Sequence, residues 1–142
     1  MHTHEFAKLL EVIVKNYQGH MEQELAPTLT TSQLTVLELL EQQNQLKPSD
    51  LIPYLSTTPA AVTMLLDRME RGELIRRVRD EGDRRIVWVS ITEKGKQEVE
   101  RGVEVRNSYL RGILDRISTH NQQLLVYLLG KISGAPAKVE AK

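Results

Sequence analysis

The stretch DEGDRRIVWVSITEKGK, residues 80–96, decides how the chain is interpreted. It places Arg84 and Arg85 beside a turn that contains a glycine, and it then continues into alternating apolar residues. The segment before it, LIRRVR at 74–79, alternates in a similar way. Two alternating segments joined by a short turn with glycine are typical of a β-hairpin. The pattern therefore predicts a hairpin with arginines at its tip.

The arginines are concentrated in this part of a chain that has no net charge. Basic and acidic residues number 19 each, yet seven of the eleven arginines lie between Arg68 and Arg85. A balanced charge argues against a protein that coats nucleic acid without regard to sequence, because such binding depends on neutralising phosphates. A local nucleic-acid site made by a few arginines is compatible with it.

Length and composition restrict the class of protein. At 142 residues the chain is long enough for one compact unit with its own core. There is no run of about 18 apolar residues to span a membrane, and the start, MHTHEF, lacks the features of an export signal. The absence of cysteine excludes disulfides and thiolate metal sites on this chain. These features predict a cytoplasmic protein with no membrane partner.

Two helices are predicted in the first part of the chain. The first has apolar residues at steps of three and four along one face, and it ends before Pro27. Thr30 and Gln33 have the spacing of a capping box, which starts the second helix. The second helix ends in the polar run EQQNQ at 41–45.

Two shorter helices with a tight turn between them follow. The third begins at Pro48, and Pro53 inside it lacks the N–H that the helix needs and should bend it. Thr58 can cap a fourth helix, which begins at Pro59 and is closed by Gly72. Two short helices joined by a tight turn form a helix-turn-helix, and a hairpin after them makes it a winged helix-turn-helix.

Helical spacing returns after the hairpin. Thr92 caps a long helix to about Arg116, and a last helix runs from about Thr119 to Ile132. The predicted fold class is mainly α with a small β-hairpin wing. It combines the winged helix-turn-helix with flanking helices.

With these elements in this order, the chain resembles the MarR family of bacterial transcription regulators. The resemblance covers roughly residues 30–96, and it rests on VTMLLDRME at 62–70, LIRR at 74–77 and DEGDRRIVWVSITEKGK at 80–96. The last segment is similar to the family's wing pattern, an Asp-x-Arg followed by apolar residues and Leu-Thr-x-x-Gly. The matching positions are Asp83, Arg85, Ile91, Thr92 and Gly95.

The sequence departs from the family pattern at three positions. Glu73 stands where the family usually has glycine, and Gly72 precedes it by one residue, which predicts a changed exit from the fourth helix. Pro53 replaces a good helix former. Met64 replaces a residue that is often polar or basic in related sequences.

The resemblance implies a complex with double-stranded DNA. The fourth helix would enter the major groove, and the wing would lie along the minor groove with Arg85 as its arginine and Asp83 as the carboxylate that orients it. A planar, permanently charged guanidinium suits the negative potential of a narrow A·T-rich minor groove. A carboxylate two residues away lies on the same side of a strand and can fix the direction of the arginine.

The predicted DNA-binding residues combine the fourth helix with the wing. They are Thr57, Thr58, Pro59, Ala60, Ala61, Thr63, Met64, Arg68, Arg77, Asp83, Arg84 and Arg85. Small apolar groups can meet thymine methyls, but few side chains here can bond two base atoms, so DNA shape and wing contacts are expected to share the specificity. For Arg77 a structural ion pair is as good an interpretation as a phosphate contact. Asp67 is expected to pair with a neighbouring arginine.

The resemblance also implies a homodimer. The first helix and the last two are too apolar on one side to stand alone in water. The predicted organisation is a dimerisation helix at 1–29, the winged helix-turn-helix at 30–96, further dimerisation helices at 97–133 and a flexible tail at 134–142. Two copies related by a twofold axis would bind a palindromic operator with half-sites one helical turn apart.

Such regulators often hold a small aromatic ligand that changes the spacing of the two DNA-binding parts. By position, Tyr17, His20 and Met21 would line the ligand crevice, and ordinary packing is the alternative for each of them.

No pattern for catalysis or for a cofactor is recognisable. The sequence has no nucleophile–base pair and no glycine-rich phosphate loop, so neither an enzyme nor a cofactor is predicted. His2 and His4 make a poor metal chelate in a chain terminus, so no metal site is predicted. Two functions remain. The first is a DNA-binding transcriptional regulator, a repressor that a small effector releases. The alternative is a winged-helix module for protein contacts only.

Overall fold

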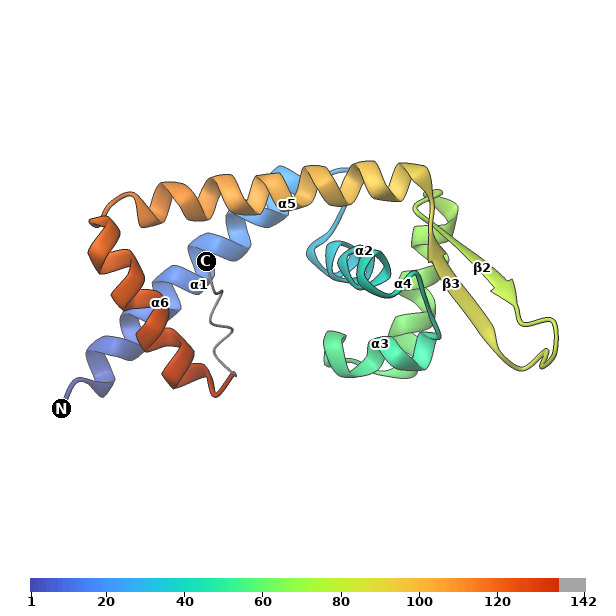
Figure 1. Cartoon of the computed structure of the whole chain (residues 1–142), viewed down its shortest axis with the longest axis horizontal. Coiled ribbons are helices and arrows are strands. Elements are labelled where there is room, and N and C mark those ends of the chain that lie inside the picture. Colours follow the sequence, from blue (N-terminus) through green and yellow to red (C-terminus); the bar gives the residue numbers. More distant parts are fainter. Residues whose placement is uncertain (136–142) are drawn as a thin grey trace. The chain divides into compact units, whose positions relative to one another are not determined.

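The computed structural model describes residues 1–135, which form a mainly helical fold with a small antiparallel sheet (Figure 1). In chain order the elements are α1 (Thr3–Leu25), α2 (Thr31–Gln43), β1 (Gln45–Leu46), α3 (Pro48–Leu55), α4 (Pro59–Arg71), β2 (Ile75–Arg79), β3 (Val87–Ile91), α5 (Glu93–Leu114) and α6 (Thr119–Ser133). The predicted mainly α fold with a β wing is confirmed. The chain divides into two units, and the boundary lies between Val105 and Arg106. The tail predicted at 134–142 lies, from residue 136 on, outside the described residues.

Side-chain caps start the helices where the sequence predicts them. The Thr30 hydroxyl accepts from the Gln33 N–H (3.2 Å), and the Gln33 side-chain oxygen accepts from the Thr30 N–H (3.1 Å), which completes the capping box of α2. The Thr58 hydroxyl accepts from the Ala61 N–H (3.2 Å) at the start of α4. Each such cap stabilises a helix by about 1 kcal/mol. The start of α4, and with it the direction of its first turn, is therefore set locally.

The sheet contains a strand that the sequence does not predict. Its strand order is β1-β3-β2, and all pairs are antiparallel. In β1, Gln45 pairs with Ser90 and Leu46 pairs with Val89. A two-residue strand has too few positions to show a period, and this one begins at the last residue of the polar run 41–45. Through β1 the base of the wing is hydrogen-bonded to the connection between α2 and α3.

The core of the first unit lies between the helices α2, α3 and α4 and the inner face of the sheet. Every member of this core is apolar, and among residues 1–135 no polar or charged residue is buried. The members contributed by these elements include Leu37, Leu40, Leu51, Val62, Leu66, Met69, Ile75 and Val89. Burial of each large apolar side chain stabilises the fold by about 1.5 to 3 kcal/mol. Burial of one side of α4 leaves its opposite side facing solvent.

Two glycines let α5 approach its neighbours closely. A Cβ at Gly95 would collide with the Leu74 carbonyl oxygen and would lie 2.7 Å from Ile91 Cγ1. A Cβ at Gly102 would lie 2.7 Å from Leu34 Cδ1. Side-chain carbons do not pack at such distances, so both positions need glycine for contact with the core. Close packing therefore explains why Gly95, the glycine of the wing pattern, is a glycine.

The end of α4 differs from the prediction that Gly72 supplies its closing turn. Gly72 has a φ of −77°, and the left-handed residue is Glu73, with a φ of 62°. The Glu73 N–H donates to the Glu70 carbonyl (2.9 Å), and the Leu74 N–H donates to the Met69 carbonyl (2.9 Å). These two bonds form a Schellman motif. The left-handed turn thus occurs at position 73, and a glutamate adopts this conformation although it has a Cβ.

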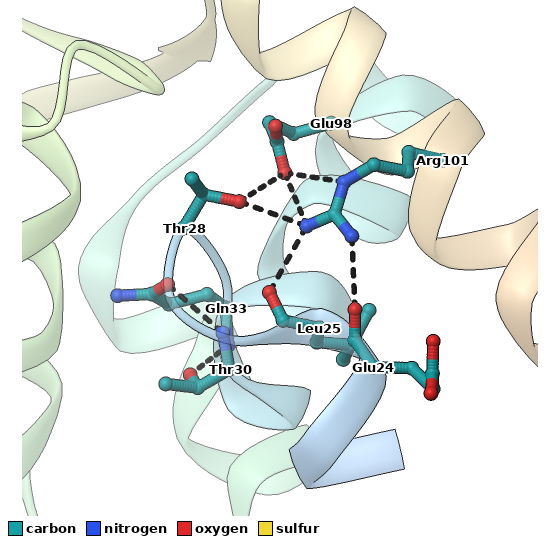
Figure 2. Close-up of polar contacts among 7 residues, drawn as sticks. All are labelled: Glu24, Leu25, Thr28, Thr30, Gln33, Glu98 and Arg101. Carbon is teal, nitrogen blue, oxygen red and sulfur yellow. Dashed lines mark hydrogen bonds and ion pairs between the residues drawn. The ribbon is translucent and has the colours of Figure 1, made fainter. Parts of the chain in front are cut away.

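Arg101 of α5 fastens the end of α1 and the loop after it (Figure 2). Its guanidinium donates to the carbonyls of Glu24 (3.1 Å) and Leu25 (3.0 Å) and to the Thr28 hydroxyl (2.8 Å). It also forms an ion pair with Glu98 (2.9 Å), which in turn accepts from Thr28 (3.1 Å). A cation at the last carbonyls of a helix lies at the negative end of its dipole. The cluster therefore stabilises the junction of α1 with α5.

Two helices leave large apolar side chains in solvent. In the first unit, α1 exposes Phe6, Leu9, Leu10, Val12, Ile13 and Val14. In the second unit, α6 has no buried residue and exposes Leu124, Leu125, Val126, Tyr127, Leu128, Leu129 and Ile132. Within residues 1–135, no helix is long and apolar enough to cross a membrane. Exposed apolar surface of this extent marks places that another molecule covers.

Candidate nucleic-acid interface

The first half of α4 presents a neutral face to solvent. Its exposed residues are Pro59, Ala60, Thr63 and Met64, and the cap Thr58 before them is exposed as well. The Met64 side chain is large and apolar, and yet the residue is 57% exposed. On the other side, Val62, Leu66 and Met69 are buried, so α4 cannot rotate without exposing its apolar side. The exposed face is therefore rigidly displayed.

Each of the two threonine hydroxyls on this face makes one hydrogen bond within the helix and can make a second one to a partner. The Thr58 oxygen accepts the capping bond from Ala61, so the hydroxyl can still donate its hydrogen to a further partner. The Thr63 hydroxyl donates to the Pro59 carbonyl (3.1 Å), so its oxygen can still accept. Thr57 and Ala61 are half-buried, and Arg68 is exposed one turn after Met64.

At the tip of the wing, Asp83 and Arg85 form a paired contact. Arg85 Nε donates to Asp83 Oδ1 and Arg85 Nη2 donates to Asp83 Oδ2, both at 3.0 Å. The backbone N–H of Arg85 donates to the same carboxylate (3.1 Å). These bonds lower the pKa of Asp83 and raise the pKa of Arg85, so both groups stay charged. The Arg85 side chain is nevertheless 91% exposed.

The predicted reason for this pairing is wrong, although the pairing itself is present. Both residues lie in the connection between β2 and β3, and neither lies on a strand. A turn, in which the Asp83 carboxylate accepts the backbone N–H two residues later, brings the two side chains together.

Asp80 holds the rest of the wing tip. Its carboxylate accepts from the indole N–H of Trp88 (3.0 Å) and from the backbone N–H of Asp83 (2.9 Å). These bonds, with that from Trp88 as the largest cause, lower the pKa of Asp80. Arg79 donates to the Arg84 carbonyl (2.7 Å). The exposed arginines thus project from a connection whose backbone is fixed by side chains, and sequence reasoning did not assign this role to Asp80.

Arg77 forms the structural ion pair, which was one of its two interpretations. Its Nη2 lies 2.7 Å from Asp67 and 3.1 Å from Glu70, and its Nε and backbone N–H also donate to Glu70. Only 25% of the Arg77 side chain is exposed. The hydrogen bond with Arg77 lowers the pKa of Glu70, and the same bond raises the pKa of Arg77. This cluster links β2 of the wing to the end of α4, and it provides the arginine partner expected for Asp67.

The residues predicted to line a ligand crevice lie on the inner part of α1. Met21 is 1% exposed and belongs to the hydrophobic core, and Tyr17 packs against that core. His20 is half-buried. These positions agree with ordinary packing, and a ligand role for the three residues stays a prediction. Among residues 1–135, no group of three His, Asp or Glu side chains is arranged to hold a metal ion.

Several known proteins are similar to this chain. The sequence profile of the MarR family matches residues 29–87, which extend from the loop before α2 to the first residue of β3. These residues of the chain match a MarR family domain. It is 28% identical over 107 residues to the HTH-type transcriptional repressor MdtR of Bacillus subtilis, and the match covers 75% of this chain and 69% of MdtR.

Solved structures show the same fold. A MarR family protein from Bacillus stearothermophilus is 29% identical, with a TM-score of 0.80 and coverage of 92% of this chain and 91% of that chain. A mutant of Escherichia coli MarR complexed with operator DNA is 23% identical, with a TM-score of 0.73 and coverage of 93% and 94%. MdtR and the Escherichia coli relative HosA, which is 28% identical over 123 residues, are both named as transcriptional regulators or repressors.

Proposed function

We propose that this MarR family protein binds a palindromic operator as a homodimer and represses transcription there. One observation carries the proposal. A neutral, exposed helix face and a rigid wing tip with exposed arginines occur in the same unit, and the Arg77 ion pairs connect the elements that bear them. A module for protein contacts would not need Arg85 held in solvent by a dedicated carboxylate.

The helix and the wing would have different tasks on the duplex. An α-helix fits the major groove of B-DNA, where base edges differ from pair to pair. The first half of α4 carries no acidic group that would repel phosphates as it enters. At the wing, Arg84 and Arg85 would enter the minor groove, whose negative potential is strongest where A·T pairs make it narrow. Because Asp83 already orients Arg85, little side-chain entropy is lost on binding.

Dimerisation would align two such units with one operator. The exposed apolar residues of α1 and of α6 supply surfaces that a second copy can cover, and burial of these surfaces drives association. A twofold dimer places two recognition helices about 34 to 36 Å apart, which matches half-sites separated by one turn of DNA. The dimer could adopt a second conformation in which the two recognition helices have a different separation. An effector that binds this conformation more tightly would release the operator.

Equilibrium titration with DNA tests the proposal. A duplex would first be selected from a random pool by the full-length protein, and its affinity would then be compared with that of a scrambled duplex at several salt concentrations. We expect preference for a palindromic sequence and an affinity that falls steeply with salt, because arginines release counterions from phosphates. Absence of any DNA binding at low salt would overturn the proposal and favour the module for protein contacts.

A further inference from the structure

The first two turns of α4 lack the side chains that usually read bases by hydrogen bonds. The structure describes all of α4, and residues 59–66 are Pro, Ala, Ala, Val, Thr, Met, Leu and Leu. Arginine on guanine and asparagine or glutamine on adenine are the usual paired contacts, and none of these residues is present in 59–66. The first ionisable group, Asp67, lies 2.7 Å from Arg77. Hydrogen-bond reading by this part of α4 is therefore limited to threonine hydroxyls.

The same two turns do present an apolar face. Ala60, Thr63 and Met64 are spaced by three and four residues, so their side chains are neighbours on one side of the helix. All three residues are exposed. The Thr63 hydroxyl is turned back to the Pro59 carbonyl, so the methyl group of Thr63 is directed elsewhere. Burial of Val62 and Leu66 holds this face outward.

An apolar face on a recognition helix has one apolar counterpart in the major groove. The thymine C5-methyl group is the only apolar substituent that the base edges present there. We infer that α4 recognises thymine methyl groups of the operator through Ala60, Thr63 and Met64. The inference rests on the proposed function, and it specifies the operator half-sites as ones that have thymines at the positions α4 contacts. The flexible Met64 side chain would adapt to the methyl that it covers.

The size of the effect follows from the area that one methyl group buries. Burial of one carbon of this size is worth about 0.8 kcal/mol, which corresponds to about a fourfold change in affinity. A symmetric dimer contacts equivalent thymines in both half-sites. Removal of one symmetric pair of methyl groups should therefore weaken binding about 15-fold.

Replacement of thymine by deoxyuracil tests this directly, because the two bases differ only by that methyl group. The probe is the duplex selected from a random pool, with deoxyuracil placed at one symmetric pair of positions at a time. We expect about a 15-fold loss at the contacted pairs and no loss at the others. The Met64→Ala variant should bind the thymine duplex more weakly and should lose its sensitivity at the pair that Met64 covers.

The Arg85→Ala variant is the matched control. Thymine and uracil present the same atoms to the minor groove, so loss of the wing arginine should weaken binding to both duplexes by the same factor. Equal affinity of wild-type protein for thymine and uracil duplexes would overturn the inference while leaving operator binding intact. Sensitivity to uracil that persists unchanged in Met64→Ala, Thr63→Ser and Ala60→Gly would overturn the residue assignment. Failure to select any specific duplex would instead count against the proposed function.

Discussion

The Arg77 guanidinium lies 2.7 Å from the Asp67 carboxylate, and it bonds Glu70 of the same helix as well. These contacts join β2 to α4, so the wing and α4 keep a fixed relation. The cluster is partly exposed, and networks of this kind contribute about 1 kcal/mol. We expect Arg77→Gln to lower the free energy of unfolding by about that amount in urea denaturation. The exposed Arg76→Gln on the same strand is the control.

The same cluster predicts a dependence on pH. Its hydrogen bonds with Arg77 lower the pKa of Glu70 below the ordinary value of 4.5. The stabilisation is therefore fully present above that value and is lost as the pH falls through the lower pKa of the folded protein. The difference in melting temperature between wild type and Arg77→Gln should narrow in acid. A difference that stays constant from neutral to acidic pH would contradict this account.

Arg85 is exposed and held by Asp83, so its loss should affect DNA binding and not stability. Arg85→Ala should weaken binding to A·T-flanked operators most, and it should reduce the slope of log affinity against log salt by about 2 per dimer. Asp83→Asn should have a smaller effect of the same sign, because it frees the arginine without removing its charge. Equal affinity of Arg85→Ala and wild type in these titrations would refute the assignment of the wing.

Arg101 connects α5 to two carbonyls at the end of α1 and to Thr28 (Figure 2). Bonds from a charged donor are stronger than neutral ones, and we expect Arg101→Ala to cost about 1 to 2 kcal/mol of stability. Arg101→Lys should recover little, because an ammonium cannot span the same partners. Arg111→Ala, on the exposed surface of the same helix, should be neutral in the same denaturation experiment. A neutral Arg101→Ala would show that the cluster is dispensable.

Glu73 carries the left-handed turn that ends α4. Its φ of 62° is unfavourable for a residue with a Cβ. Position 72 has a φ of −77°, which does not require glycine. Glu73→Gly should therefore raise the free energy of unfolding by about 0.5 to 1 kcal/mol. Gly72→Ala should be tolerated, because its Cβ would meet nothing closer than the Arg68 carbonyl oxygen at 3.4 Å. Destabilisation by Glu73→Gly would contradict this explanation of the turn.

The exposed apolar residues of α1 and α6 should be the dimer surfaces. Ile13→Glu and Leu128→Glu place charges at positions that are 57% and 45% exposed in the protomer. Each should leave the helical content unchanged but give monomers in sedimentation velocity, and operator affinity should fall with the loss of the second half-site. Tyr54→Glu on α3, at a position 58% exposed, should remain dimeric. Dimers that persist in both α1 and α6 variants would place the interface elsewhere.

Much of the fold follows from local sequence patterns. Threonine caps at Thr30 and Thr58 set helix starts, and the change from helical to alternating spacing after Gly72 marks the wing. These signals act over a few residues, so they can be recognised without knowledge of the tertiary structure. The wing arginines and the exposed start of α4 were identified in the same way.

Contacts between segments that are distant in the sequence cannot be predicted from such local signals. Three such features are β1, the cluster around Arg101 and the pairing of Asp80 with Trp88. No local periodicity in the sequence indicates that the segments involved approach one another. The choice of partner for Arg77 was open in the sequence, because Asp67 and Glu70 face β2 only once α4 has packed on the sheet.

The sequence by itself determined where the helices and the wing begin, and it determined that arginines lie along the wing and at its tip. Only the tertiary structure decided which of these arginines are available to a partner. A guanidinium is equally charged at Arg77 and Arg85. Packing places Arg77 between two carboxylates and leaves Arg85 in solvent, because burial of the apolar side of α4 fixes which acids reach the neighbouring strand.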